Sequence, residues 1–83
     1  MTRMVEAVRA EALFVSTVQA SEIPAADQVR HAVASTLRVL GVRGCAAQVA
    51  GEYGEHPETA AARMCWALAT VRVAYPTARP LAA

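Results

Sequence analysis

Residues 57–74 place the strongest constraint on the fold, because apolar side chains recur at helical spacing on two opposite sides of this segment. One stripe consists of Ala60, Met64, Ala67, Leu68, Val71 and Tyr75, and the opposite stripe consists of Ala62, Trp66, Ala69 and Val73. A helix that is apolar nearly all round has to be covered nearly all round. We therefore expect one continuous helix over 57–74, with the Trp66 stripe forming an interface to the first helix of the same chain or to a second copy.

Three more segments have the periodicity of helices, with apolar residues every three or four positions. The expected helices span 3–19, 24–40, 45–53 and 57–74. Pro24 suits the first turn of a helix, and Gly41 and Gly54 are typical of the residue just beyond a helix end. A chain of 83 residues has room for a single core. The sequence thus predicts an all-α, four-helix domain over 1–76, followed by a flexible tail over 77–83.

The composition limits how this domain is stabilised and what it attracts. Of the 83 residues, 20 are Ala, so the helices have to pack closely through small side chains. A domain of this size buries only about 60–65% of the surface of its unfolded chain, so oligomerisation would add stability. The formal net charge of +1 creates no strong field toward nucleic acid or an anionic membrane. All eight basic residues are Arg, which is typical of a bacterium with a GC-rich genome.

The segment 46–64 resembles the helix-turn-helix of bacterial DNA-binding regulators. The residues that carry the resemblance are Ala50, Tyr53, Gly54, Pro57, Ala60 and Met64. In that motif a small residue lets two helices approach, a glycine makes a tight turn, and the second helix lies in the major groove. The resemblance implies a helix-turn-helix over 45–74, which forms a tri-helical core with the helix over 24–40.

The resemblance also implies a set of DNA contacts and a class of function. Arg43, Thr59 and Arg63 would contact the DNA, and Arg30 or Arg38 would touch its backbone. Paired motifs let one protein bind two half-sites. The function implied is therefore a homodimeric DNA-binding or transcription-associated regulator.

Acidic residues around the expected turn favour a different function. Glu52, Glu55 and Glu58 surround this turn, where the phosphate backbone would repel them. Glu55 and Arg63 also stand at positions that are usually apolar in the motif. The second hypothesis is a helical interaction module, an adaptor or a small subunit of an assembly, that buries the Trp66 stripe against a protein partner. The sequence leaves both hypotheses open.

The potential metal ligands and nucleophiles are too scattered in the sequence to indicate chemistry. His31, Cys45, His56 and Cys65 occur singly, whereas zinc ligands usually come in close pairs, and no set of polar residues indicates a catalytic pocket. We therefore expect no metal, no cofactor and no enzymatic activity. The sequence has no signal-peptide pattern and no stretch of about 20 apolar residues that could span a membrane. We expect a cytoplasmic protein without a membrane partner.

Overall fold

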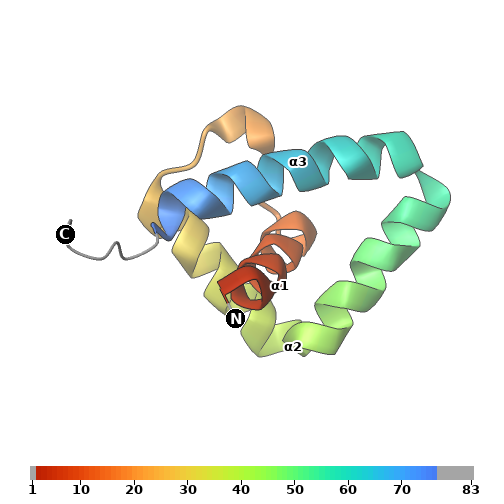
Figure 1. Cartoon of the computed structure of the whole chain (residues 1–83), viewed down its shortest axis with the longest axis horizontal. Coiled ribbons are helices and arrows are strands. Elements are labelled where there is room, and N and C mark those ends of the chain that lie inside the picture. The colour runs from red at the N-terminus through yellow and green to blue at the C-terminus, as the bar shows by residue number, and fades with distance from the viewer. Residues whose placement is uncertain (1, 77–83) are drawn as a thin grey trace.

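The computed structural model describes residues 2–76 and has an all-α fold. Its elements are α1 (Thr2–Val15), the short 3-10 helix η1 (Ala20–Glu22), α2 (Ala26–Glu55) and α3 (Pro57–Ala74) (Figure 1). No strand occurs within residues 2–76. The predicted fold class is confirmed, but the predicted count of four helices is not. The tail predicted over 77–83 lies outside the described residues.

The helices expected over 24–40 and 45–53 are the two halves of one kinked helix, α2. Inside α2, Gly41 departs from helical backbone angles, with φ 73° and ψ 171°, a conformation that is essentially restricted to glycine. Gly41 therefore interrupts the helix, but the helix resumes at the next residue. The change of direction of α2 is visible in Figure 1. A gap that we expected to separate two helices is thus a one-residue kink.

The turn between α2 and α3 is also shorter than expected. Gly54 is helical, α2 continues to Glu55, and His56 (φ −139°, ψ 67°) is the single residue between the two helices. Pro57 occupies the start of α3, and the continuous helix predicted over 57–74 is confirmed. A helix-turn-helix uses a turn of three or four residues, so this junction is tighter than the motif that the sequence resembles.

Helix α1 ends earlier than expected because Ser16 stabilises a turn. The Ser16 hydroxyl donates a hydrogen bond to the Leu13 carbonyl at 2.7 Å and accepts one from the Val18 amide at 3.2 Å. Such local bonds compete with the continuation of a helix. The helix expected over 3–19 therefore stops at Val15, and the chain continues into η1.

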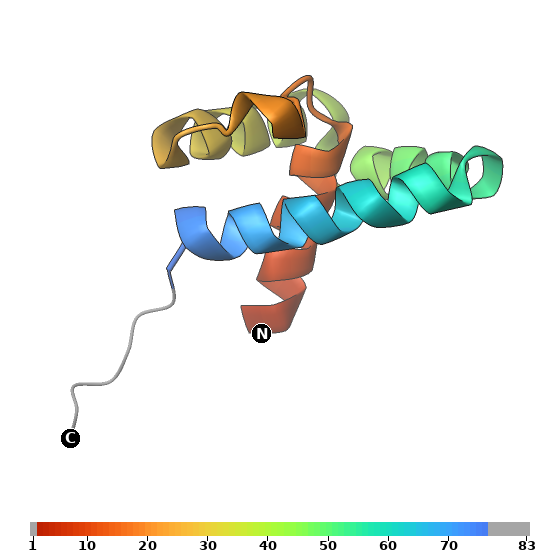
Figure 2. The ribbon, with the colours of Figure 1, turned by 90° about the horizontal axis from the view of Figure 1, so that it is seen from above.

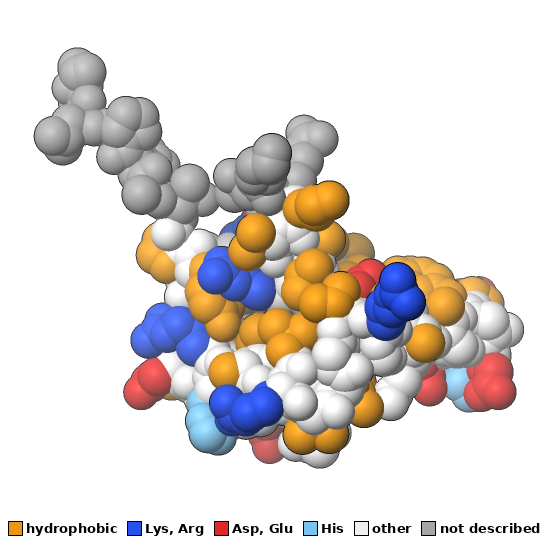
Figure 3. Space-filling model, turned by 90° about the horizontal axis from the view of Figure 1, so that it is seen from below, with side chains coloured by type: hydrophobic (Ala, Val, Ile, Leu, Met, Phe, Trp, Pro, Cys, Tyr) orange, Lys and Arg blue, Asp and Glu red, His pale blue; other side chains and the backbone are white. Residues whose placement is uncertain are grey.

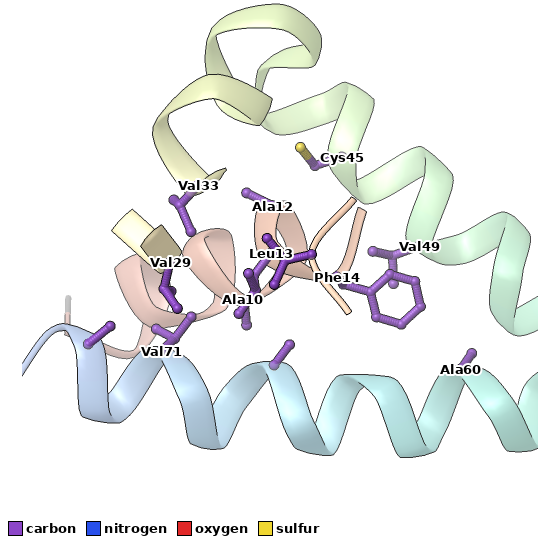
Figure 4. Close-up of a cluster of buried hydrophobic side chains, with 13 residues drawn as sticks. Ala10, Ala12, Leu13, Phe14, Val29, Val33, Cys45, Val49, Ala60 and Val71 are labelled. Atoms are coloured by element: carbon purple, nitrogen blue, oxygen red, sulfur yellow. The ribbon is translucent and has the colours of Figure 1, made fainter. Parts of the chain in front are cut away.

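Helix α1 runs through a frame made by α2 and α3. Seen end-on in Figure 1, α1 lies inside the triangle that α3 and the two halves of α2 form, and Figure 2 shows it crossing their layer. Its second half is the centre of the core, since Ala10, Ala12 and Leu13 are fully buried and Phe14 is nearly so. Figure 4 shows these side chains between those of α2 and α3. Helix α1 therefore packs against both of the other helices, which also contact each other directly.

Gly54→Ala is expected to raise the free energy of unfolding by about 0.5–1 kcal/mol, because alanine loses less conformational entropy than glycine in a helix. A Cβ atom at this position meets nothing within 4 Å. Gly41→Ala is the matched variant, since its Cβ also meets nothing within 4 Å. The positive φ of Gly41 makes alanine cost about 1–3 kcal/mol. Urea unfolding followed by circular dichroism measures both effects, and a destabilised Gly54→Ala would indicate that Gly54 lies in a turn.

Candidate functional site

Arg63, one of the expected DNA contacts, binds the C-terminal end of α1. Its Nε donates to the Phe14 carbonyl at 2.7 Å, and its Nη2 donates to the carbonyls of Leu13, Ser16 and Val18 at 3.4, 3.2 and 2.9 Å. The last four carbonyls of a helix have no partner within that helix, and the helix dipole favours a cation beside them. Arg63 therefore satisfies the end of α1 and the turn that follows it.

The guanidinium of Arg63 also packs between two aromatic rings. Its Cζ atom lies 4.8 Å from the centre of the Trp66 ring and 5.8 Å from that of Phe14. Burial lowers the pKa of Arg63 from its ordinary value, although an arginine side chain stays charged in proteins. The side chain that the motif would direct at DNA is thus engaged inside the fold. Its contact with DNA stays a prediction.

The other expected DNA contacts do not gather on one face. Arg30 donates from Nη1 to the Ala74 carbonyl at 2.9 Å, at the C-terminal end of α3, while Thr59 is exposed in the first turn of α3. α3 has 18 residues, which separates its ends by about 27 Å. Arg38 and Arg43 are exposed on α2, on either side of the kink. The predicted DNA contacts are therefore spread over both ends of α3 and the middle of α2.

The junction of α2 and α3 is an acidic end of the molecule. Glu52, Glu55 and Glu58 are exposed there together with His56, and Figure 3 shows acidic side chains and a histidine at this end, on the right. Ala50, which was expected to let two helices approach, is exposed as well. A DNA backbone that approached the first turn of α3 would therefore meet carboxylates, which repel its phosphates.

The outer face of α3 carries the stripe that was predicted to form an interface. We define this face as Glu58, Ala62, Cys65, Trp66, Ala69, Arg72 and Val73. Ala69 lies on the opposite side of the helix from the buried Ala60, because 3.6 residues make a turn. Ala62 and Ala69 are exposed, Val73 is 78% exposed and Trp66 is half-buried. One of the two arrangements expected from the sequence had the first helix covering this stripe. In the structure Ala62, Ala69 and Val73 stay exposed, and only Trp66 of the stripe packs partly against the core.

A hollow of about 370 Å³ adjoins the outer face of α3. Its lining is mainly apolar and includes Trp66, Ala69 and Val73 of α3, and Ile23 and Pro24 from the segment before α2. Ile23 is 86% exposed and has φ 49°, a left-handed conformation that is unusual for a β-branched residue. Such strained residues cluster at functional sites. Sequence reasoning missed Ile23, because helical spacing does not extend to this segment.

A larger hollow, of about 650 Å³, lies between the end of α1 and α2. The polar side chains around it include Gln28, His31, Ser35 and Gln48. Among the described residues that line it, His31 is the only titratable side chain, so the hollow brings no acid and base together. General acid–base chemistry requires such groups within hydrogen-bond reach of a substrate.

The two cysteines differ in their surroundings. Cys45 is buried in the core, where burial and the nearby charge of Glu11 raise the pKa of its thiol, and Cys65 is exposed on the outer face of α3. Within residues 2–76 no three His, Cys, Asp or Glu side chains lie close enough together to hold a metal ion. No helix in the same range is long and apolar enough to cross a membrane. The expected lack of cofactor and enzymatic activity stays a prediction.

Similarity to known proteins does not identify a family for this chain. No family model, curated protein or solved structure matches it. The resemblance of residues 46–64 to a helix-turn-helix therefore stays a prediction as well. The function has to be inferred from the chain's own side chains.

Of the two sets of residues predicted from the sequence, only the interface set lies together. Its four members share one side of α3 and three of them line the hollow, because helical spacing alone places them. The DNA-contact set depends on how the helices meet, and two of its members, Arg30 and Arg63, bind backbone carbonyls. The sequence contained one signal for the role of Arg63. This residue stands at a position of the motif that is usually apolar, where the side chain faces a neighbouring element.

Proposed function

We propose that this chain is a helical interaction module that binds a protein through the outer face of α3. The observation that carries the proposal is the exposure of apolar side chains there. Val73 is 78% exposed and Ile23, which lines the same hollow, is 86% exposed, although the core on the other side of α3 is closed. Contiguous apolar surface on a soluble domain marks interaction sites. Aromatic residues such as Trp66 are favoured at the centres of these sites.

The charges of the described residues favour a protein partner over DNA. Arg63 and Arg30 bind backbone carbonyls, and Arg72 pairs with Glu6 at 3.0 Å. Affinity for DNA depends on basic side chains that neutralise phosphates, and each of these three already uses part of its donors within the chain. A helix face that is apolar along its middle suits a protein surface better than a phosphate backbone.

A photo-reactive residue placed at Ala69 tests the proposal in cells that make the protein. We expect discrete cross-linked products from this position and none from Ala47, an exposed alanine of α2 that serves as the matched control. The products are identified by mass spectrometry and rebuilt from purified components. Val73→Glu, which places a charge on the outer face, is expected to remove them. Equal products from both positions, or none from Ala69, would contradict the proposal.

Titration of labelled random-sequence and genomic duplexes tests the regulator hypothesis. An affinity for DNA that falls steeply as the salt concentration rises is the signature of phosphate contacts. We expect no DNA binding of this kind. Arg38→Ala and Arg43→Ala are the informative variants, because both side chains are exposed on α2 and their removal leaves the core intact. Salt-dependent binding that weakens in these variants would favour the regulator over the interaction module.

A further inference from the structure

We infer that the partner of the outer face of α3 is a second copy of this chain, aligned antiparallel about a two-fold axis beside Cys65. The inference rests on the proposed function, since it names the protein that the face binds. In a two-fold symmetric dimer both copies use the same surface, so this surface has to complement itself. The outer face of α3 meets that condition in its charges and in its shape.

The two charged residues of the face are placed for such pairing. Glu58 and Arg72 lie seven residues before and after Cys65, close to two helical turns in each direction, and all three are exposed. An antiparallel copy centred on Cys65 therefore brings Glu58 of each copy beside Arg72 of the other. A parallel copy would set carboxylate against carboxylate and guanidinium against guanidinium, which is unfavourable.

Arg72 has hydrogen-bond donors left for a second carboxylate. Its Nε and Nη2 bind Glu6 of the same chain at 3.0 and 3.4 Å, and its side chain is 61% exposed. A guanidinium has five N–H donors, so the Nη1 group remains for Glu58 of a second copy. The bond to Glu6 also holds Arg72 in place before association.

The shape of the face suits the same alignment. Ala62, Cys65 and Ala69 are small and exposed, so two α3 helices can approach closely along the middle of the face. Ala62 of one copy then lies near Ala69 of the other. Trp66 follows Cys65 in the sequence, and the axis passes beside Cys65. The two indoles therefore meet along one edge of the interface. The two ion pairs form along the other edge, one at each end. Aromatic residues are enriched in interfaces, and charged residues are usual at their rim.

The hollow beside α3 supports the alignment as well. The first turn of the second copy's α3 lies along Ala69 and Val73, which line the hollow together with Ile23. Contact there removes strongly exposed apolar side chains from water, which is favourable in proportion to the area buried. A chain of 83 residues gains from this burial because its own core is small.

Cross-linking through Cys65 tests the position of the axis. A short bismaleimide is expected to convert the purified chain to a covalent dimer, because Cys65 is exposed and Cys45 is buried. Cys65→Ser is expected to abolish this product, and Cys45→Ala is expected to retain it. Sedimentation equilibrium of the untreated chain is expected to show dimerisation that Ala69→Arg weakens by about tenfold and that Ala47→Arg leaves unchanged.

An exchange of charges tests the antiparallel alignment. Glu58→Arg or Arg72→Glu sets like charges against each other in both ion pairs, so each variant alone is expected to dimerise about tenfold more weakly. An equimolar mixture of the two variants restores opposite charges in both pairs and is expected to recover dimerisation. In a parallel dimer, neither variant would dimerise more weakly than the unaltered chain. Circular dichroism checks that both variants are folded.

The outcomes separate this inference from the function on which it rests. A chain that stays monomeric and forms no cross-link would overturn the inference, whereas cross-linking from position 69 to a different protein would still support the interaction module. A dimer that is unchanged in Glu58→Arg and Arg72→Glu would overturn the antiparallel alignment. A monomer that also gives no product from position 69 in cells would overturn both.

Discussion

Leu13→Ala is expected to lower the free energy of unfolding by about 3–5 kcal/mol. Leu13 is fully buried in α1, where α1 passes between α2 and α3 (Figure 4). Removing its branched side chain leaves a cavity that all three helices border. A helix that shifted to fill this cavity would lose part of its packing against the other two. A domain has only about 5–15 kcal/mol of stability in total, so this variant loses a large part of it.

Urea unfolding followed by circular dichroism measures the loss. Met4→Ala is the matched control on the same helix, since Met4 is 71% exposed and its truncation is expected to change stability by less than about 0.5 kcal/mol. Similar losses from the two variants would mean that α1 lies on the surface of the molecule and does not pass through the frame of α2 and α3.

The position of α1 shows what helical spacing alone does not predict. Spacing predicted one apolar face for this helix, but Ala12, Leu13 and Phe14 are three consecutive buried residues, and these cannot all lie on one face. Such a run is typical of a helix with neighbours on several sides. Which helix occupies the middle depends on how the three helices meet, and no single segment determines that arrangement.

Helix α3 differs from α1 in the opposite direction, because it is covered on fewer sides than the spacing of its apolar residues predicted. Its two apolar stripes predicted a helix covered on both sides, yet within residues 2–76 only the stripe that contains Ala60 and Val71 is closed. α1 can occupy one side of α3, so the stripe on the other side stays exposed. The four residues of the second stripe do lie on one face, because a regular helix fixes their relative positions, whereas their role in an interface stays a prediction. A second copy was the other cover expected from the sequence, and it stays a prediction.

The parts of the site that sequence reasoning missed depend on other kinds of structure. Ile23 itself has left-handed backbone angles and lies between η1 and α2. No periodic pattern includes this residue. Arg63 binds carbonyls that lie 45 and 50 residues earlier in the chain. A contact over this separation follows from the packing of α1 against α3, which the periodicity of either helix does not encode.

Arg63→Met is expected to lower the free energy of unfolding by about 2–4 kcal/mol. Methionine keeps part of the apolar contact with Trp66 and Phe14 but removes the donors that bind the end of α1. A hydrogen bond to a charged group contributes about 1.5–3 kcal/mol, and a buried acceptor without a partner costs further free energy. The bonds of Arg63 are only partly buried, so water replaces some of them and the total stays below the sum of the separate bonds.

Arg43→Met is the matched control, because Arg43 is exposed on α2 and its loss is expected to cost less than about 0.5 kcal/mol. Arg63→Lys keeps the charge without the planar fork of donors. Its loss in the free energy of unfolding is expected to lie between those of Arg63→Met and Arg43→Met. Equal, small losses in all three variants would mean that the guanidinium does not hold α1.

Because Arg63 also packs on Trp66, its loss is expected to weaken dimerisation as well as stability. A weaker DNA affinity in an Arg63 variant would therefore not establish a DNA contact, whereas a weaker affinity in Arg43→Ala would.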